Sequence, residues 1–224
     1  MKVVYETHQT IDVKPGKITV LATNNQTVYL ELIRGMKDMN ESIHFYDDDY
    51  KEVDHNKAMD WDGDVVADLS LEKTYSTEII KYINQSLTDE ERRQLDQAGL
   101  EFYTAIQDKL LMVDIPLEVS FDGDIKRMMK YAQIHFPKEI NNDPYGIIEA
   151  DLKIHLECDD QSIIGLTNVA HYLTLDQISH LVEINDHLQT KVLLVEFTES
   201  RNQDAYPNCD YYYIDEDFVD WGSN

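Results

Sequence analysis

The sequence predicts an α/β protein with a mainly parallel sheet and an inserted lobe of helices. Residues 162–166 and 192–197 are short apolar runs with little alternation, which is typical of strands buried on both faces of a parallel sheet. Between these runs, apolar residues recur at helical spacing over residues 175–188. Residues 161–197 therefore predict a β-α-β unit. A helical pattern without strands follows residue 69, and it predicts the inserted lobe.

The first part of the chain predicts strands at 3–5, 18–21 and 43–46, and a helix at 27–36. The turn Lys14-Pro15-Gly16-Lys17 separates the first two strands. The acidic segment 47–68 predicts a solvated loop. Within it, Asp60-Trp61-Asp62-Gly63-Asp64 imitates the start of an EF-hand loop, but the glycine is misplaced and the expected glutamate is absent.

The remaining helices are predicted at 79–86, 88–113, 125–134 and 144–157, and a closing strand at 211–214. Capping boxes mark two helix starts, one at Thr88 with Glu91 and one at Thr174 with Gln177. We therefore expect an α/β head domain over residues 1–68 and 144–224 and an α-helical leg domain over residues 69–143.

Charge is the strongest compositional signal, with 44 acidic against 19 basic residues and a net charge of −25. Taken alone, this charge argues against nucleic-acid binding, because phosphate contacts need Lys and Arg. There is no run of about 18 apolar residues and no apolar N-terminal signal segment. We expect a soluble, cytoplasmic protein without membrane contact, and its two isolated cysteines predict no disulfide.

Catalytic signatures are missing from the sequence. A strand, a polar link and a helix stand where a P-loop would lie, but the link at residues 22–26 has neither glycine nor lysine. The HExxH and GxSxG motifs are absent as well. We therefore expect no enzymatic activity.

Basic and acidic residues gather in the leg. Lys126, Arg127 and Lys130 lie on one side of a predicted helix, and ordinary solvated charges would show the same pattern. Nearby carboxylates suit a hard ion such as calcium, although chance clustering competes in so acidic a chain. This candidate metal set is Glu118, Asp122, Asp124, Glu139 and Asp143.

Three stretches in this order resemble the small adaptation protein of type II-A CRISPR systems, the Csn-two family. They are IIGLTN followed by YLTLDQISHLVEIN, then KVLLVEFTESR, and finally YYYIDEDF. The resemblance covers nearly the whole chain and is strongest over residues 143–218. Where family members carry a lysine-rich run before the first central strand, this chain has ECDDQ at residues 157–161.

The resemblance implies a degenerate P-loop-ATPase-like head, an inserted helical leg and a homotetrameric ring that takes double-stranded DNA by its ends. It also implies structural calcium (Ca2+) near the leg, and a role in spacer acquisition beside the CRISPR effector nuclease and integrase proteins. On this basis, the residues expected to contact DNA are Lys14, Lys17, Lys126, Arg127, Lys130 and Arg201. The alternatives are an acidic interaction module that imitates DNA charge, and a P-loop-like nucleotide hydrolase.

Overall fold

The computed structural model describes residues 1–67 and 69–222. The chain forms two compact units: unit 1 comprises Met1–Leu71 with Pro137–Asn224, and unit 2 comprises Glu72–Phe136. The boundaries between the units therefore lie at 71/72 and 136/137. The sequence predicted them at 68/69 and 143/144. Unit 2 is an insertion between two segments of unit 1, and each unit is described by itself.

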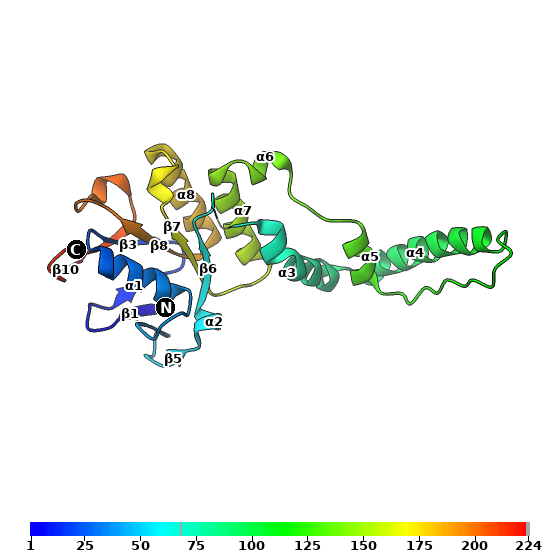
Figure 1. The fold of residues 1–224 in the computed structure, drawn as a ribbon, viewed down its shortest axis with the longest axis horizontal. Coiled ribbons are helices and arrows are strands. Elements are labelled where there is room, and N and C mark those ends of the chain that lie inside the picture. Colours follow the sequence, from blue (N-terminus) through cyan, green and yellow to red (C-terminus); the bar gives the residue numbers. More distant parts are fainter. Residues whose placement is uncertain (68, 223–224) are drawn as a thin grey trace. The chain divides into compact units, whose positions relative to one another are not determined.

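A six-stranded sheet forms the centre of unit 1 (Figure 1). Its strands run in the order β10-β9-β3-β8-β7-β6, and all neighbours are parallel except β9 and β10. The strands are β3 (Ile18–Thr23), β6 (Met59–Gly63), β7 (Ile163–Thr167), β8 (Lys191–Phe197), β9 (Asp210–Ile214) and β10 (Asp220–Trp221). The predicted α/β class and mainly parallel sheet are confirmed.

The predicted β-α-β unit consists of β7, helix α8 (Leu175–Leu188) and β8. Every residue of β3 and β7 is buried, which explains their unbroken apolar pattern. The capping box at the start of α8 is present, with the amide of Thr174 donating to Gln177 Oε1 at 2.9 Å and the amide of Gln177 donating to Thr174 Oγ1 at 3.3 Å. Helix α7 (Pro144–Glu157) packs against α8.

A second, antiparallel sheet completes unit 1, and its strand order is β2-β1-β4-β5. Its strands are β1 (Lys2–Tyr5), β2 (Ile11–Asp12), β4 (Ile43–Tyr46) and β5 (Glu52–Val53). The sequence predicted β1, β3 and β4 as strands but not their division between two sheets. Helix α1 (Gln26–Met36) shares a core with this sheet, because Val28 and Leu32 belong to the same buried cluster as Val3 and Phe45.

Unit 2 is helical, as its sequence pattern predicts. It holds α3 (Leu71–Ser86, whose first residue belongs to unit 1), α4 (Asp89–Leu110) and α5 (Ile125–Tyr131), while the short helices α2 (His55–Ala58) and α6 (Lys138–Asn141) belong to unit 1. The capping box of Thr88 and Glu91 starts α4. Helix α5 is shorter than predicted, because Gln133 adopts a left-handed φ of 54°. Within the described ranges, no helix has the length and apolar character needed to cross a bilayer.

The segment 47–68 differs from the predicted solvated loop. It contains β5, α2 and β6, and β6 is the outer strand beside β7. Asp62 is only 6% exposed, so the run that imitates an EF-hand is a half-buried strand instead. The strand forms because Trp61 and Met59 pack over Gly165 of β7 and because the backbone pairs with that strand. Asp68 lies outside the described residues.

Gly165→Ala tests this packing. An added Cβ would lie 2.6 Å from Trp61 Cε3 and 2.7 Å from Met59 Sδ, so β6 must move. We expect a loss of about 1–3 kcal/mol in the free energy of unfolding. Both tryptophans, Trp61 and Trp221, lie in unit 1, so urea titration followed by tryptophan fluorescence reports on this unit. The matched control is Gly146→Ala in α7, where the nearest atom is a flexible Asp143 oxygen at 3.3 Å. Equal midpoints for the two variants would contradict the packing argument.

Candidate functional site

A basic groove of 360 Å³ lies between α3 and α5 in unit 2. Helix α3 supplies Thr77, Ile80 and Lys81, and α5 supplies Lys126, Arg127 and Lys130, with Asp124 completing the lining. Lys126 and Lys130 are four residues apart, so they lie on the same face of α5. The structure therefore unites the three predicted cations of the leg and adds Lys81.

The cations of the groove are not equally available. Arg127 forms ion pairs with Asp122 and, at 3.9 Å, with Asp124. These side chains are well exposed, and such pairs contribute little energy, so Arg127 can exchange its partners for another anion. Among the described residues, no ion pair engages Lys81, Lys126 or Lys130. The groove thus presents ammonium groups that suit a phosphate oxygen.

The basic residues predicted in the head lie at opposite edges of the parallel sheet. Lys17 directly precedes β3, whereas Arg201 follows β8, and the two strands run parallel. The length of the strands separates the edges by roughly 20 Å. Arg201 lies over the Trp221 ring, 5.9 Å from its centroid. The head residues therefore do not form one site within a single chain.

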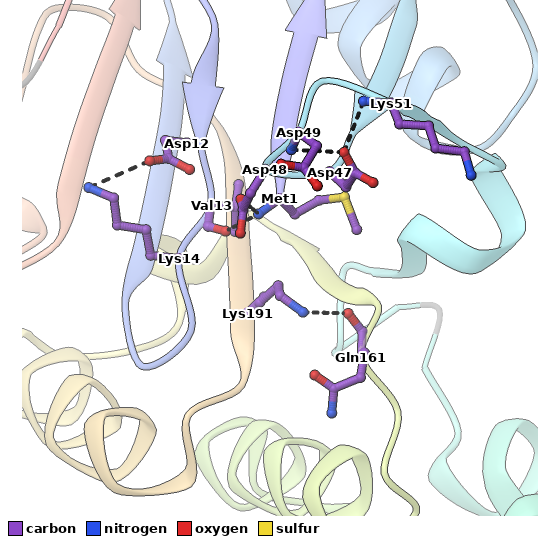
Figure 2. A network of polar contacts seen from close by, with 10 residues as sticks. All are labelled: Met1, Asp12, Val13, Lys14, Asp47, Asp48, Asp49, Lys51, Gln161 and Lys191. Carbon is purple, nitrogen blue, oxygen red and sulfur yellow. Dashed lines mark hydrogen bonds and ion pairs between the residues drawn. The ribbon is translucent and has the colours of Figure 1, made fainter.

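The amino-terminal edge mixes both signs of charge (Figure 2). Lys14 Nζ lies 3.7 Å from Asp12, and the amino group of Met1 lies 3.5 Å from Asp48. Lys191 Nζ donates a hydrogen bond to the carbonyl of Gln161 at 2.7 Å. The positive charge of the exposed Lys14 ammonium is thus partly compensated by Asp12.

The five predicted metal-ligating carboxylates are all exposed and divide between the units. Glu118, Asp122 and Asp124 belong to unit 2, and Glu139 and Asp143 to unit 1. Asp122 and Asp124 converge on Arg127, and the amide of Asp124 donates to Asp122 Oδ1 at 3.1 Å. Asp143 caps α7 by accepting from the amide of Tyr145 at 3.3 Å. Within unit 2, the structure therefore brings Asp122 and Asp124 together.

A buried carboxyl group lies at the carboxyl edge of the sheet. Glu196 is 1% exposed, and its Oε1 accepts a hydrogen bond from the amide of Val169 at 2.8 Å. Burial raises the pKa of Glu196 to about 7, against the opposing effects of the Val169 amide and the Tyr206 hydroxyl. At this edge, β3 ends at Thr23 and α1 begins at Gln26, so the link is too short for a glycine-rich phosphate loop.

A histidine and several aspartates gather where α7 ends beside β6. Nε2 of His155 lies 3.4 Å from Asp60 Oδ2, and Nδ1 lies 3.4 Å from Asp151 Oδ1. Single ligand atoms of Asp60, His155 and Asp160 all lie within 4.8 Å of one another, so these residues can hold a metal ion. His155 and Asp151 are almost fully buried, whereas Asp160 is exposed.

The charge states within this cluster depend on one another. Burial by itself lowers the pKa of His155, but the hydrogen bonds and charges of Asp151 and Asp60 outweigh it and raise the pKa to about 11. Burial and the neighbouring Asp151 raise the pKa of Asp62 well above its usual range. These carboxylates therefore favour a cation or extra protons among them.

Sequence reasoning missed this cluster and also missed Lys81. The available signals were Asp151 and His155, which lie four residues apart among the apolar residues of α7, and the alternation of Asp60 with Asp62. Asp60 and Asp62 were instead assigned to a solvated loop. Lys81 had no signal in its own helix, because its basic neighbours lie on α5.

Comparison with known families shows to which family this chain belongs. The family model described as CRISPR-associated protein (Cas_Csn2) matches residues 36–218, which is most of the chain. The chain belongs to the Cas_Csn2 family. The resemblance inferred from the three sequence stretches is therefore confirmed.

The fold of this Cas_Csn2 protein has a parallel among solved structures. It is similar to the crystal structure of Stu0660 of Streptococcus thermophilus, with a TM-score of 0.61 and 10% sequence identity. The match covers 100% of this chain and 76% of Stu0660. At this identity, the likeness concerns the fold alone. A search of curated proteins found no match.

Glu196 predicts a pH dependence of stability in this Cas_Csn2 protein. Its pKa is raised on folding, so its contribution to stability is fully present below about pH 4.5 and is lost as the pH rises through about 7. Glu196→Gln removes this titration. We expect the variant to gain roughly 3 kcal/mol relative to wild type between pH 4.5 and 8.

Urea unfolding at several pH values, followed by tryptophan fluorescence, measures this difference. The control is Glu199→Gln, which removes an exposed carboxyl group close by in the chain. A difference between wild type and Glu196→Gln that stays constant with pH would show that Glu196 ionises without penalty in the folded protein.

Proposed function

We propose that this Cas_Csn2 protein acts in CRISPR spacer acquisition as a non-catalytic protein that binds the ends of double-stranded DNA without sequence preference. The observation that supports it most is the basic groove of Lys81, Lys126, Arg127 and Lys130 in a chain of net charge −25. Clustered exposed cations contact phosphate oxygens, which every DNA sequence presents alike. The groove thus supports binding to the DNA backbone.

Assembly into a homotetrameric ring is part of the proposal. Unit 2 exposes many large apolar side chains, and such surfaces commonly mark protein contacts. They include Leu100, Phe102, Leu111, Met112, Ile115, Tyr131 and Ile134. A ring would repeat the groove four times around one opening, so that the local positive charge adds up while the acidic surface faces outward. A duplex would then enter by a free end.

Calcium is proposed to stabilise unit 2 through the acidic residues beside the groove. The donors are all carboxylate oxygens, which fit calcium chemically. Asp122 and Asp124 already lie together, and Glu118 precedes them in the same unit. An ion there would compete with Arg127 for both aspartates and would leave its guanidinium free for phosphate. Glu139 and Asp143, the other two carboxylates of the predicted set, lie in unit 1 and are proposed to bind calcium there.

The head is proposed to be a degenerate P-loop-ATPase-like domain without catalysis, and unit 2 to be its leg. The support is the parallel sheet with a helix directly after β3, together with the short β3–α1 link that has no glycine and no lysine. The proposed partners are double-stranded DNA, further copies of this chain, and the CRISPR effector nuclease and integrase proteins. In the head, Lys14, Lys17 and Arg201 would add weaker phosphate contacts.

A second candidate is an acidic interaction module that imitates the charge of DNA. The net charge of −25 favours it, because this charge attracts a basic protein partner and repels DNA. It predicts no binding to DNA under any ionic condition.

Charge reversal in the groove tests the DNA-binding proposal. We expect Lys126→Glu with Lys130→Glu to weaken duplex binding about ten-fold or more, equally on unrelated sequences. We also expect the salt dependence to decrease by roughly one unit of slope for each lysine that contacts a phosphate. The matched control is Lys37→Glu with Lys109→Glu, which changes the same charge outside the groove. Mobility shift over a salt series, with circular dichroism to verify folding, is the measurement.

Binding at DNA ends and its dependence on calcium are tested with linear and covalently closed duplexes of the same sequence. Duplex binding is measured by mobility shift with calcium or with chelator. Binding to the linear duplex alone, strengthened by calcium, is expected for a ring that takes DNA by its ends. Equal binding to both forms would remove the threading mechanism. Binding to neither would leave the acidic interaction module as the function.

A further inference from the structure

The turn that ends α7 places Asp160 beside His155. The amide of Asp160 donates to the carbonyl of His155 at 2.9 Å, and the amide of Asp159 donates to the carbonyl of Leu156 at 3.2 Å. Asp159 adopts a left-handed φ of 54°. These features define a Schellman motif, which folds the chain back over the last helical turn. Asp160 Oδ1 then accepts from the amide of Ser162 at 2.9 Å, which fixes its carboxylate at the start of β7.

The two nitrogens of His155 have different surroundings. Nδ1 faces two acceptors of Asp151, the backbone carbonyl at 3.2 Å and the carboxylate Oδ1 at 3.4 Å. In the neutral ring, Nδ1 therefore carries the proton, and the lone pair of Nε2 points toward Asp60. A carboxylate behind Nδ1 is the usual arrangement for a metal-binding histidine, because it fixes the ring and strengthens its donor nitrogen.

The distances fit a metal ion that takes the place of the His155–Asp60 ion pair. Nε2 of His155 and Oδ2 of Asp60 are 3.4 Å apart, longer than the usual charge-assisted hydrogen bond of about 2.7–2.9 Å. Two ligands at about 2.1 Å from a tetrahedral zinc ion are themselves roughly 3.4 Å apart. The closest ligand atoms of Asp160 also lie within 4.8 Å of both.

The negative charge of the cluster also favours a bound metal ion. Asp60, Asp62, Asp151 and Asp160 surround one imidazole, and Asp151 is fully buried. A buried carboxylate requires a cation or a proton close by. The basic side chains whose charges act on these carboxylates are His155 itself and Lys191, and the ammonium of Lys191 also donates to the carbonyl of Gln161. A divalent cation would add two positive charges among these carboxylates.

We propose that Asp60, His155 and Asp160 bind one divalent transition-metal ion of the zinc type, with Asp151 as the residue that positions His155. One nitrogen and two carboxylate ligands suit zinc, cobalt or manganese, whereas calcium takes only oxygen ligands. This site belongs to unit 1 and differs in ligand chemistry from the calcium set proposed for unit 2. The ion joins the outer strand β6 to the end of α7. Asp60 and Asp160 reach solvent, which gives the ion a path of entry.

Zinc titration of the full chain tests this site. The protein is first treated with chelator, and zinc binding is then measured by competition with a zinc indicator dye, without DNA. We expect one zinc ion per chain and a rise in the thermal unfolding temperature of unit 1, followed by tryptophan fluorescence. Asp60→Asn and Asp160→Asn should each weaken binding about ten-fold or more. A tenfold excess of calcium should not displace the zinc.

The variants are chosen so that loss of binding is not loss of fold. Asp160 is exposed, and an asparagine there still accepts the hydrogen bond from the Ser162 amide. The matched control is Asp159→Asn, which removes the same charge from the adjacent residue and keeps a side chain that tolerates the left-handed conformation. This control should bind zinc as wild type does.

Two results would overturn the proposal. The first is a folded wild-type chain that binds no zinc at micromolar concentrations. The second is zinc binding that remains unchanged in both Asp60→Asn and Asp160→Asn, because the ion would then lie elsewhere. Neither result bears on DNA binding, so this site and the proposed function succeed or fail separately.

Discussion

The parallel pairing of β3, β8 and β7 is the constraint on which the rest of unit 1 depends. These strands are buried on both faces, so their amide and carbonyl groups have no access to water and must pair with one another. The register aligns Val20 with Leu194 and Ile164 with Val192. This alignment determines what reaches each edge of the sheet: Lys191 at the amino edge and Glu196 at the carboxyl edge. The polar residues of the head are therefore positioned by hydrogen bonds made within its apolar centre.

Sequence pattern was sufficient wherever one segment determines its own structure. The apolar runs at 162–166 and 192–197 predicted β7 and β8, and residue types at helix starts predicted the caps of α4 and α8. Strand β6 could not be predicted in this way. Its sequence MDWDG has as many acidic as large apolar side chains, and it is a strand only because β7 pairs with it and Gly165 makes room for Trp61.

The candidate sites follow the same rule. Lys126, Arg127 and Lys130 were found because their spacing within one helix places them together. Lys81 joins them only because α3 and α5 line the same groove, which no local spacing encodes. His155 and Asp60 meet because a helix end lies beside an outer strand. Sites within one element can be predicted from spacing, and sites between elements need the tertiary structure.

The nested arrangement of the two units has a consequence for synthesis of the chain on the ribosome. Strand β3 pairs with β8 and β9, and β6 pairs with β7, so the main sheet needs residues from both sides of the insertion. Unit 2, by contrast, is one continuous segment. It emerges complete while the sheet still lacks three of its parallel strands, so it can fold first. Nascent chains halted once residue 136 has left the ribosome would then contain a folded helical unit attached to an unfinished head.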